Sequence, residues 1–164
     1  MNLTEYKREI NGIRQASLCF LVNEDNILLT MKKRGFGEGK WNGFGGKADL
    51  NEDIEACAIR EAREEVSIEP INLKKAATMF YYYDTPNRDK NWEVTVFIID
   101  KWEGLPDESE EVRPEWFNIN DIPFEQMWSD DKYWLPRILN GEELRGEFLF
   151  DEKMEIIDFD IVHI

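Results

Sequence analysis

Two glutamates lie on the face of a predicted helix that should be buried. Residues 53–66 have the spacing of an amphipathic helix, in which each residue advances by about 100°, and the apolar stripe is formed by Cys57, Ala58 and Ala62. Glu61 and Glu65 fall in the middle of this stripe, and Glu64 lies beside them. Such carboxylates repel each other unless a cation lies between them, and an all-oxygen ligand set favours Mg²⁺ or Mn²⁺ over zinc.

An ordinary solvated acidic face is the alternative interpretation of this helix. It would be held by i,i+4 ion pairs such as Arg60 with Glu64. The angular position of the other two acids counts against it, because a solvated face would not share the apolar stripe. The preceding loop contains Gly45 and Gly46, which let the backbone approach a metal or ligand closely, although such a pair alone usually marks only a turn.

These residues together form a recognisable motif. Gly46, then Glu52, then the run REAREE at residues 60–65 have the spacing of the Nudix box, which the sequence closely resembles. The chain departs from the box at two positions, because Ala62 replaces a larger aliphatic residue and Ser67 replaces a glycine. That glycine would end the helix in the left-handed conformation. Serine adopts this conformation at a cost of about 1 kcal/mol, or the helix ends differently.

The resemblance extends well beyond the box. Residues 31–47, MKKRGFGEGKWNGFGGK, and residues 113–139 are similar to the eukaryotic MutT-homologue hydrolases of oxidised purine nucleoside triphosphates. This similarity implies an α+β (mixed α/β) protein with the Nudix fold, an α/β/α sandwich around a mixed central sheet. It also implies an enzyme that converts nucleotides such as 8-oxo-dGTP or 2-hydroxy-dATP to the monophosphate and pyrophosphate, and so cleanses the nucleotide pool.

The resemblance assigns roles to the acids near the box. The implied cofactor is Mg²⁺, with Mn²⁺ as a substitute. The expected metal ligands are the carbonyl of Gly45 or Gly46 and the carboxylates of Glu61, Glu64, Glu65 and Glu111. The expected catalytic residues are Arg60, Glu64, Glu65 and Glu111. Arg60 would orient the glutamates through charge-assisted hydrogen bonds, and Glu111 would be either a metal ligand or the general base.

A second set of residues resembles the pocket in which the family reads an oxidised purine. Asn42, Asp130 and Asp131 match its polar groups. An ionised carboxylate accepts hydrogen bonds from N1–H and the 2-amino group of an oxidised guanine, and a protonated neighbour donates to O6. The same pair would read 2-hydroxyadenine after exchanging these roles. Taken alone, residues 129–131 predict only a helix capped by Ser129, and the two interpretations are compatible.

Other residues are expected around this pocket. Four aromatic side chains would wall it by stacking, namely Phe36, Tyr81, Trp128 and Trp134. Tyr81 stands where the mammalian-type enzymes have phenylalanine, so a hydroxyl is added there. Ser17 matches a pocket hydroxyl. Lys32 is expected to contact the substrate, although solvated charge is the ordinary interpretation of such a lysine.

Hydrophobic patterning predicts the elements that must position these residues. Expected strands cover residues 15–22, 27–32, 76–84, 92–100, 115–119, 148–150 and 156–164, and the first two form a hairpin. A second helix is expected from Ser129 to Leu139. We expect one domain over residues 15–164, preceded by an N-terminal arm of residues 1–14 that is either a short helix or mobile.

Composition restricts the class of protein. The chain of 164 residues has a net charge of −15, which disfavours binding to nucleic acid or anionic lipid and means that a polyanionic substrate needs metal ions or local basic groups. Its one histidine, His163, lies at the chain end, which argues against a catalytic triad. Cys19 and Cys57 are expected to be buried free thiols. With no membrane-length apolar run and no signal-peptide core, we expect a cytoplasmic monomer whose partner is a small nucleotide.

Two rival functions remain at this point. The first is a Nudix hydrolase of another nucleoside diphosphate derivative such as ADP-ribose, because the box is shared across the superfamily. Only Asn42, Asp130 and Asp131 favour an oxidised purine over that substrate. The second rival is a non-catalytic nucleotide-binding module, which the intact set of box acids disfavours.

Overall fold

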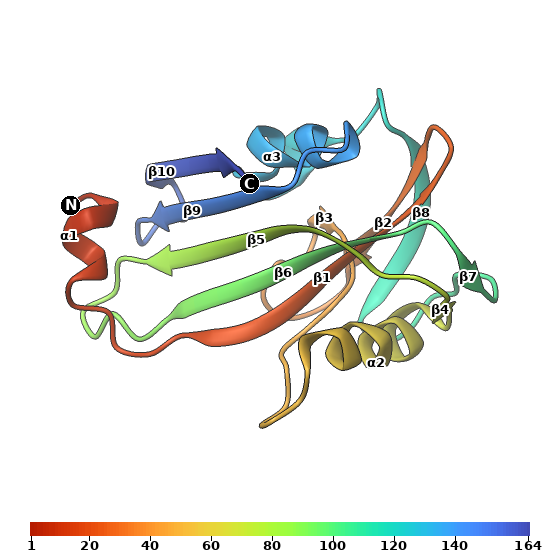
Figure 1. The fold of residues 1–164 in the computed structure, drawn as a ribbon, viewed down its shortest axis with the longest axis horizontal. Helices are drawn as coiled ribbons and strands as arrows, with labels where there is room; N and C mark the ends of the chain where they lie inside the picture. The colour runs from red at the N-terminus through yellow and green to blue at the C-terminus, as the bar shows by residue number, and fades with distance from the viewer.

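The computed structural model describes residues 1–164 and contains a mixed eight-stranded sheet (Figure 1). Its strands are β1 (Arg14–Asn23), β2 (Asn26–Lys32), β3 (Trp41–Asn42), β5 (Lys74–Tyr83), β6 (Asn91–Ile99), β8 (Val112–Asn118), β9 (Leu144–Phe150) and β10 (Ile156–His163). A separate small sheet pairs β4 (Glu69–Pro70) with β7 (Trp102–Glu103). The helices are α1 (Leu3–Lys7), α2 (Ile54–Val66) and α3 (Asp131–Leu139), with a 3₁₀ turn at Phe124–Gln126.

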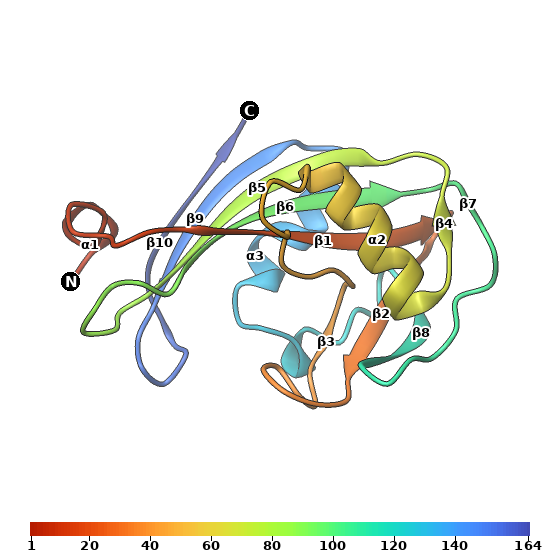
Figure 2. The ribbon, with the colours of Figure 1, turned by 90° about the horizontal axis from the view of Figure 1, so that it is seen from below.

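The main sheet runs in the order β10-β9-β5-β6-β1-β2-β3, and β8 pairs with β2. β1 pairs parallel with β6 and β5 pairs parallel with β9, while the other neighbours are antiparallel. The predicted hairpin of β1 and β2 exists only at its turn, where Val22 pairs with Ile27 and Asn23 with Asn26. β1 then continues beside β6, and β2 turns away to pair with β8, so the sheet is strongly bent (Figure 2).

Helices α2 and α3 cover opposite faces of the sheet, which confirms the predicted α/β/α sandwich. Alternate side chains of a strand point to opposite faces, so Phe20 packs in the core on the α3 side and Leu21 in the core on the α2 side. On the α2 side, fully buried Ala58 and Ala62 let the helix lie close to the sheet. The site residues on the two helices are therefore held by separate cores.

The N-terminal segment forms the short helix α1, one of the two predicted alternatives. A capping box between Asn2 and Glu5 starts it. Tyr6 is fully buried, and its hydroxyl donates to the carbonyl of Tyr83, 2.6 Å away. Lys7 pairs with Glu147 of β9 at 2.6 Å. These contacts attach the segment to the end of the sheet where β5 finishes.

Several boundaries differ from the sequence-based expectations. β9 begins at Leu144 instead of residue 148, because Glu147 interrupts the apolar pattern and is nevertheless buried beside Arg145 and Lys7. The expectation that Ser129 caps the second helix is wrong. Asp130 occupies that cap position without a side-chain cap bond, because its carboxylate is engaged elsewhere, as described below.

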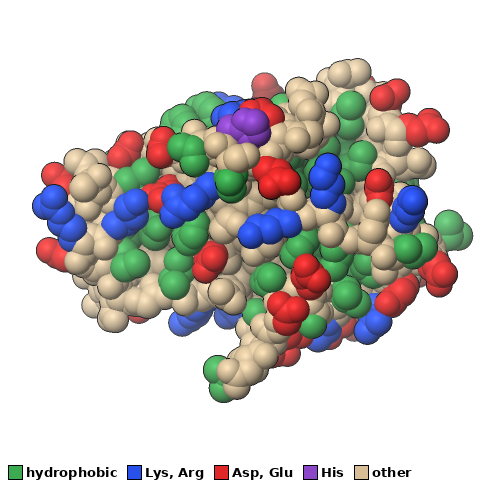
Figure 3. Space-filling model, viewed as in Figure 1, with side chains coloured by type: hydrophobic (Ala, Val, Ile, Leu, Met, Phe, Trp, Pro, Cys, Tyr) green, Lys and Arg blue, Asp and Glu red, His purple; other side chains and the backbone are tan.

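The surface carries mixed charge despite the net excess of acids. The face seen in Figure 3 shows lysine and arginine side chains interspersed with acidic ones across the sheet. No helix of the protein has both the length and the apolar character needed to cross a bilayer.

Candidate active site

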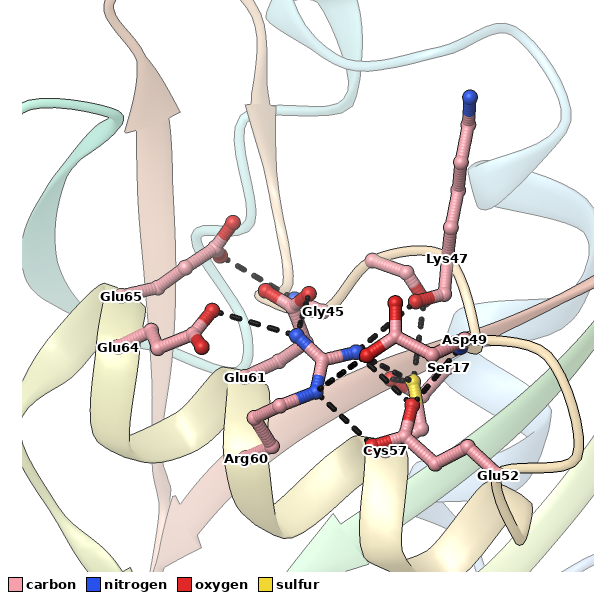
Figure 4. Close-up of polar contacts among 11 residues, drawn as sticks. Ser17, Gly45, Lys47, Asp49, Glu52, Cys57, Arg60, Glu61, Glu64 and Glu65 are labelled. Atoms are coloured by element: carbon pink, nitrogen blue, oxygen red, sulfur yellow. Dashed lines mark hydrogen bonds and ion pairs between the residues drawn. The ribbon is translucent and has the colours of Figure 1, made fainter.

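Helix α2 presents its central acids toward the sheet, as the angular analysis predicted. Glu65 is only 8% exposed and the side chain of Glu61 only 13%, whereas the side chain of Glu64 is 58% exposed. Figure 4 shows these side chains on successive turns of the helix, next to the Gly45 loop. Ser67 ends the helix in the left-handed conformation, with φ 59° and ψ 34°, so the first of the two predicted endings is confirmed.

Arg60 ties the helix acids to the loop before the helix. Its guanidinium makes two bonds of 2.9 Å to Glu52, one of 3.0 Å to Glu61 and one of 3.3 Å to Glu64. It also donates to the carbonyl of Lys47 at 3.0 Å. The hydrogen bonds from Arg60 lower the pKa of Glu52 to about 2, so this carboxylate stays ionised. The position agrees with the orienting role expected for Arg60.

Glu65 is the acid whose ionisation costs most in this helix. Burial raises its pKa to about 7, and the neighbouring charge of Glu61 adds to the shift. The N–H of Gly45, 3.2 Å from Oε2, is the hydrogen-bond donor that opposes it. Burial raises the pKa of Glu61 as well. Glu61 has an ion pair with Arg60, but Glu65 has none, so the charge of Glu65 would not be compensated.

The glycine pair leaves space that any side chain would fill. A Cβ on Gly46 would lie 2.5 Å from Oε1 of Glu61, and a Cβ on Gly45 would overlap the carbonyl of Ser17. The Gly46 carbonyl accepts the N–H of Ser17 at 2.9 Å and the thiol of Cys57 at 3.4 Å. The Gly45 carbonyl accepts no hydrogen bond from the chain. Of the two predicted carbonyl ligands, Gly45 is therefore the free one.

This donor set fits a divalent cation in its chemistry. It consists of oxygen atoms only, from two inward carboxylates and an unpaired carbonyl, and such ligands suit Mg²⁺ or Mn²⁺. The acids do not yet converge, because no group of three acidic side chains has the geometry of a metal site. Glu64 lies at the surface in an ion pair with Arg60, away from the inward acids.

Two adjoining hollows form one cleft along the sheet. The larger, of about 1140 Å³, extends over the face of the sheet that carries α3, and the smaller, of about 570 Å³, lies beside α2. Both are lined by Lys32, Arg34, Gly45, Gly46, Glu65 and Glu111. The cleft therefore connects the acids of α2 with the expected base pocket.

Glu111 lies at the junction of the two hollows, just before β8. Its carboxylate pairs with Lys32 at 3.2 Å and with Arg34 at 2.6 Å. The hydrogen bond from Arg34 is the first cause that lowers the pKa of Glu111. Glu111 is thus ionised and close to the α2 acids, but it would have to leave these partners to bind a metal or act as a base.

The base end of the cleft contains the predicted polar residues. Asp130 and Asp131 are 3% and 2% exposed, and both line the larger hollow together with Asn42. Phe36 stacks on Trp128 with ring centroids 4.9 Å apart and forms a wall at the mouth. The structure therefore brings these five residues together, as the resemblance implied.

The two acids of the base end differ in their partners. Oδ2 of Asp130 accepts the hydroxyl of Tyr81 and the indole N–H of Trp134, each at 2.8 Å. Oδ2 of Asp131 is buried and has no hydrogen-bond partner. Burial raises the pKa of both carboxyls, and it raises that of Asp131 well above its usual value because the charge of Asp130 adds to the effect.

Of two further expected pocket residues, Trp134 lies outside the lining of the cleft and Ser17 lies within it. Trp134 is fully buried in the core on the α3 side and does not line the cleft, so the expectation that it stacks on the ligand is wrong. The hydroxyl of Ser17 lies 3.4 Å from Sγ of Cys57, beneath the Gly46 loop, and not beside the acids of α3. Ser17 lines the cleft nearer its metal end.

Two residues of the cleft floor were not predicted. Tyr83 and Phe150 line the larger hollow and stack with ring centroids 5.5 Å apart. The period of two along β5 could have identified Tyr83, because it shares the strand face of Tyr81. Phe150 had no such signal, since its place opposite Tyr83 depends on the parallel pairing of β5 with β9.

Comparison with known proteins shows the family of the chain. The family model described as NUDIX domain matches residues 12–138. An oxidized purine nucleoside triphosphate hydrolase of Danio rerio is 42% identical over 142 residues, which cover 87% of this chain and 90% of that protein. The protein of the same name from Mus musculus is 39% identical over 149 residues, covering 90% and 94%. The chain therefore belongs to the Nudix family.

A solved structure supports the fold. The crystal structure of a MutT protein from Bacillus halodurans matches with a TM-score of 0.77 at 24% sequence identity, covering 90% of this chain and 97% of that chain. This likeness bears on the architecture alone.

Proposed function

We propose that this protein is a Mg²⁺-dependent pyrophosphohydrolase that converts oxidised purine nucleoside and deoxynucleoside triphosphates to the monophosphate and pyrophosphate. One observation carries the proposal: a single cleft joins the inward acids of α2 to the buried acid pair of α3. A phosphate chain needs metal ligands, and a purine edge needs hydrogen-bonding groups. The activity named for the relatives from Danio rerio and Mus musculus supports the same reaction.

At the phosphate end, the carboxylates of Glu61 and Glu65 and the carbonyl of Gly45 are proposed to hold the metal. Glu64 and Glu111 would join them after leaving their present ion pairs. Bound Mg²⁺, or Mn²⁺ in its place, would neutralise these acids and polarise the phosphoryl oxygens. This explains how a protein with a net charge of −15 accepts a triphosphate.

The side chains around the metal have separate proposed tasks. Arg60 holds the helix acids beside the loop that contains Gly46, through bonds to Glu61 and to the carbonyl of Lys47. Lys32, whose amino group faces the cleft beside Glu111, is proposed to contact the phosphate chain. Glu64, Glu65 and Glu111 are the candidates to take the proton from the water that attacks the β-phosphorus.

At the other end, Asn42, Asp130 and Asp131 are proposed to read the purine edge while Phe36 and Trp128 cover the ring. An ionised carboxylate and a protonated one provide the acceptor and the donor that an oxidised purine requires. The burial of both acids supports this, because hydrogen bonds discriminate best where an unpaired group cannot turn to water.

A panel of nucleotides tests the proposal. Purified protein with Mg²⁺ is incubated with 8-oxo-dGTP, 2-hydroxy-dATP, dGTP and ADP-ribose, and pyrophosphate and monophosphate release are measured. We expect the oxidised triphosphates to have the highest kcat/KM, with pyrophosphate as product. A clear preference for ADP-ribose would contradict the substrate assignment, and binding without turnover would favour the non-catalytic alternative. We further propose a cytoplasmic monomer, which size-exclusion chromatography and localisation would check.

A further inference from the structure

We propose that the hydroxyl of Tyr81 is a specificity determinant that fixes the negative charge on Asp130 and so restricts the pocket to one hydrogen-bonding pattern. This inference rests on the proposed function, because it concerns the purine edge that the site reads. It also revises the role expected for Tyr81, from a stacking wall to a positioning residue that acts through Asp130.

One oxygen atom of Asp130 accepts two hydrogen bonds from side chains. Oδ2 of Asp130 receives the Tyr81 hydroxyl and the Trp134 indole N–H, each at 2.8 Å. An indole N–H can only donate, so this oxygen must accept. With the Tyr81 hydroxyl as second donor, Oδ2 has no room for a proton of its own. Both bonds favour the ionised form of Asp130 over that of its neighbour, and Oδ1 receives no hydrogen bond from another residue of the chain.

The neighbouring acid, Asp131, lacks such donors. Oδ2 of Asp131 is buried and has no partner in the protein. Lys40 is the cation that favours the ionised form of Asp131, but its amino group lies over the ring of Trp128 and not beside the carboxyl. Burial raises the pKa of both acids, whereas the bonds from Trp134 and Tyr81 lower that of Asp130 alone. The shared proton is therefore held by Asp131, which becomes the donor.

The two acids would meet the hydrogen-bonding edge of a purine. A 2-amino-6-oxopurine and a 6-amino-2-oxopurine present donors and acceptors in opposite order along the same edge. A pair of acids that exchanges one proton freely accommodates both. A pair in which one oxygen is held by two donors accommodates one pattern better, because the other requires the proton to move onto Asp130.

The chain provides a matched control for the test. Tyr83 lies two residues further along β5, on the same face, and lines the same hollow. Its ring stacks on Phe150, but its hydroxyl makes no hydrogen bond within the protein. Tyr81→Phe and Tyr83→Phe therefore remove the same atom from neighbouring rings, and only the first removes a donor from Asp130.

The experiment compares these two variants with the unaltered protein. The kcat/KM ratio for 8-oxo-dGTP against 2-hydroxy-dATP is measured, and the Kd ratio for the two monophosphates is measured by calorimetry without metal. We expect Tyr81→Phe to move both ratios toward unity by about tenfold, the equivalent of one pKa unit. We expect Tyr83→Phe to leave both ratios unchanged.

Each outcome decides one of the two proposals. Unaltered ratios in Tyr81→Phe, or equal movement in Tyr83→Phe, would overturn the role of the hydroxyl. If the unaltered protein hydrolyses neither nucleotide but the monophosphate ratio still responds to Tyr81→Phe, the proposed activity fails and the charge assignment stands. Thermal unfolding of both variants checks that the core around Phe148 and Phe150 is intact, because each keeps its aromatic ring.

Discussion

The protein shields two pairs of acids from bulk water, and the two pairs differ in the hydrogen-bond donors that surround their carboxylates. On α2, Glu65 has one backbone N–H as hydrogen-bond donor, and its pKa rises to about 7. On α3, Asp130 has two side-chain donors on one oxygen. The first pair is short of positive charge, and a cation can complete it. The second is organised by the protein itself, and one oxygen of Asp131 has no hydrogen-bond partner. Burial of acids alone therefore does not identify a binding site. The kind of ligand is indicated by which hydrogen-bonding or ionic partners the buried acids lack.

Replacing Glu65 by glutamine is the strongest test of the metal end. We expect kcat to fall by about 10³-fold, equivalent to about 4 kcal/mol, because a metal ligand and a candidate base are lost together. The fold should remain intact, since glutamine has the same shape and removes a buried charge. Steady-state kinetics and circular dichroism would measure this. Full activity in Glu65→Gln would refute the assigned role.

Replacing Asp130 by alanine tests the base end separately. We expect kcat/KM for 8-oxo-dGTP to fall by about 100-fold and that for dGTP to fall less, because an acceptor for the purine edge is lost. The Mg²⁺ concentration for half-maximal activity should stay the same, since the α2 acids are untouched. Kinetics with both nucleotides and a Mg²⁺ titration check this. Equal losses for the two nucleotides would count against the pocket.

The metal-free protein should lose stability as the pH rises. The pKa of Glu65 is raised from 4.5 to about 7 in the folded state, so its proton stabilises the fold below pH 4.5. This stabilisation is lost between about pH 4.5 and 7, on the order of 3 kcal/mol, and Mg²⁺ should restore it above that range. Thermal unfolding in chelator at several pH values measures it, with Glu65→Gln as control. A parallel pH dependence in both proteins would contradict the assignment.

The smallest expected effect is at Ser67, where α2 ends. Ser67→Gly should stabilise the protein by about 0.5 kcal/mol, because glycine adopts a φ of 59° without strain but also gains freedom in the unfolded chain. Melting temperature should rise by about 1–2 °C. Activity should not change, since the acids stay in place. A decrease in melting temperature would show that the serine is not strained there.

The sequence predicted the metal end better than the base end, for a physical reason. The acids of α2 and their burial follow from the period of one helix, which is local. The hydrogen bonding of the Asp130 carboxylate is not local, because its partner Tyr81 lies 49 residues away on another element. For the same reason Ser129 was wrongly expected to cap α3, and Trp134 was wrongly expected to stack on the ligand. Both errors involve the Asp130 carboxylate, which bonds Tyr81 of β5 and the indole of Trp134.

Helix α1 is connected to the floor of the cleft by a hydrogen bond between Tyr6 and Tyr83. Tyr6 holds the main-chain oxygen of Tyr83, and the ring of Tyr83 forms part of the cleft floor. A helix that lies outside the matched family region thereby anchors the end of β5 at the floor of the cleft. A change at Tyr6 would therefore act on the cavity through Tyr83, although α1 contributes no residue to the lining of the cleft.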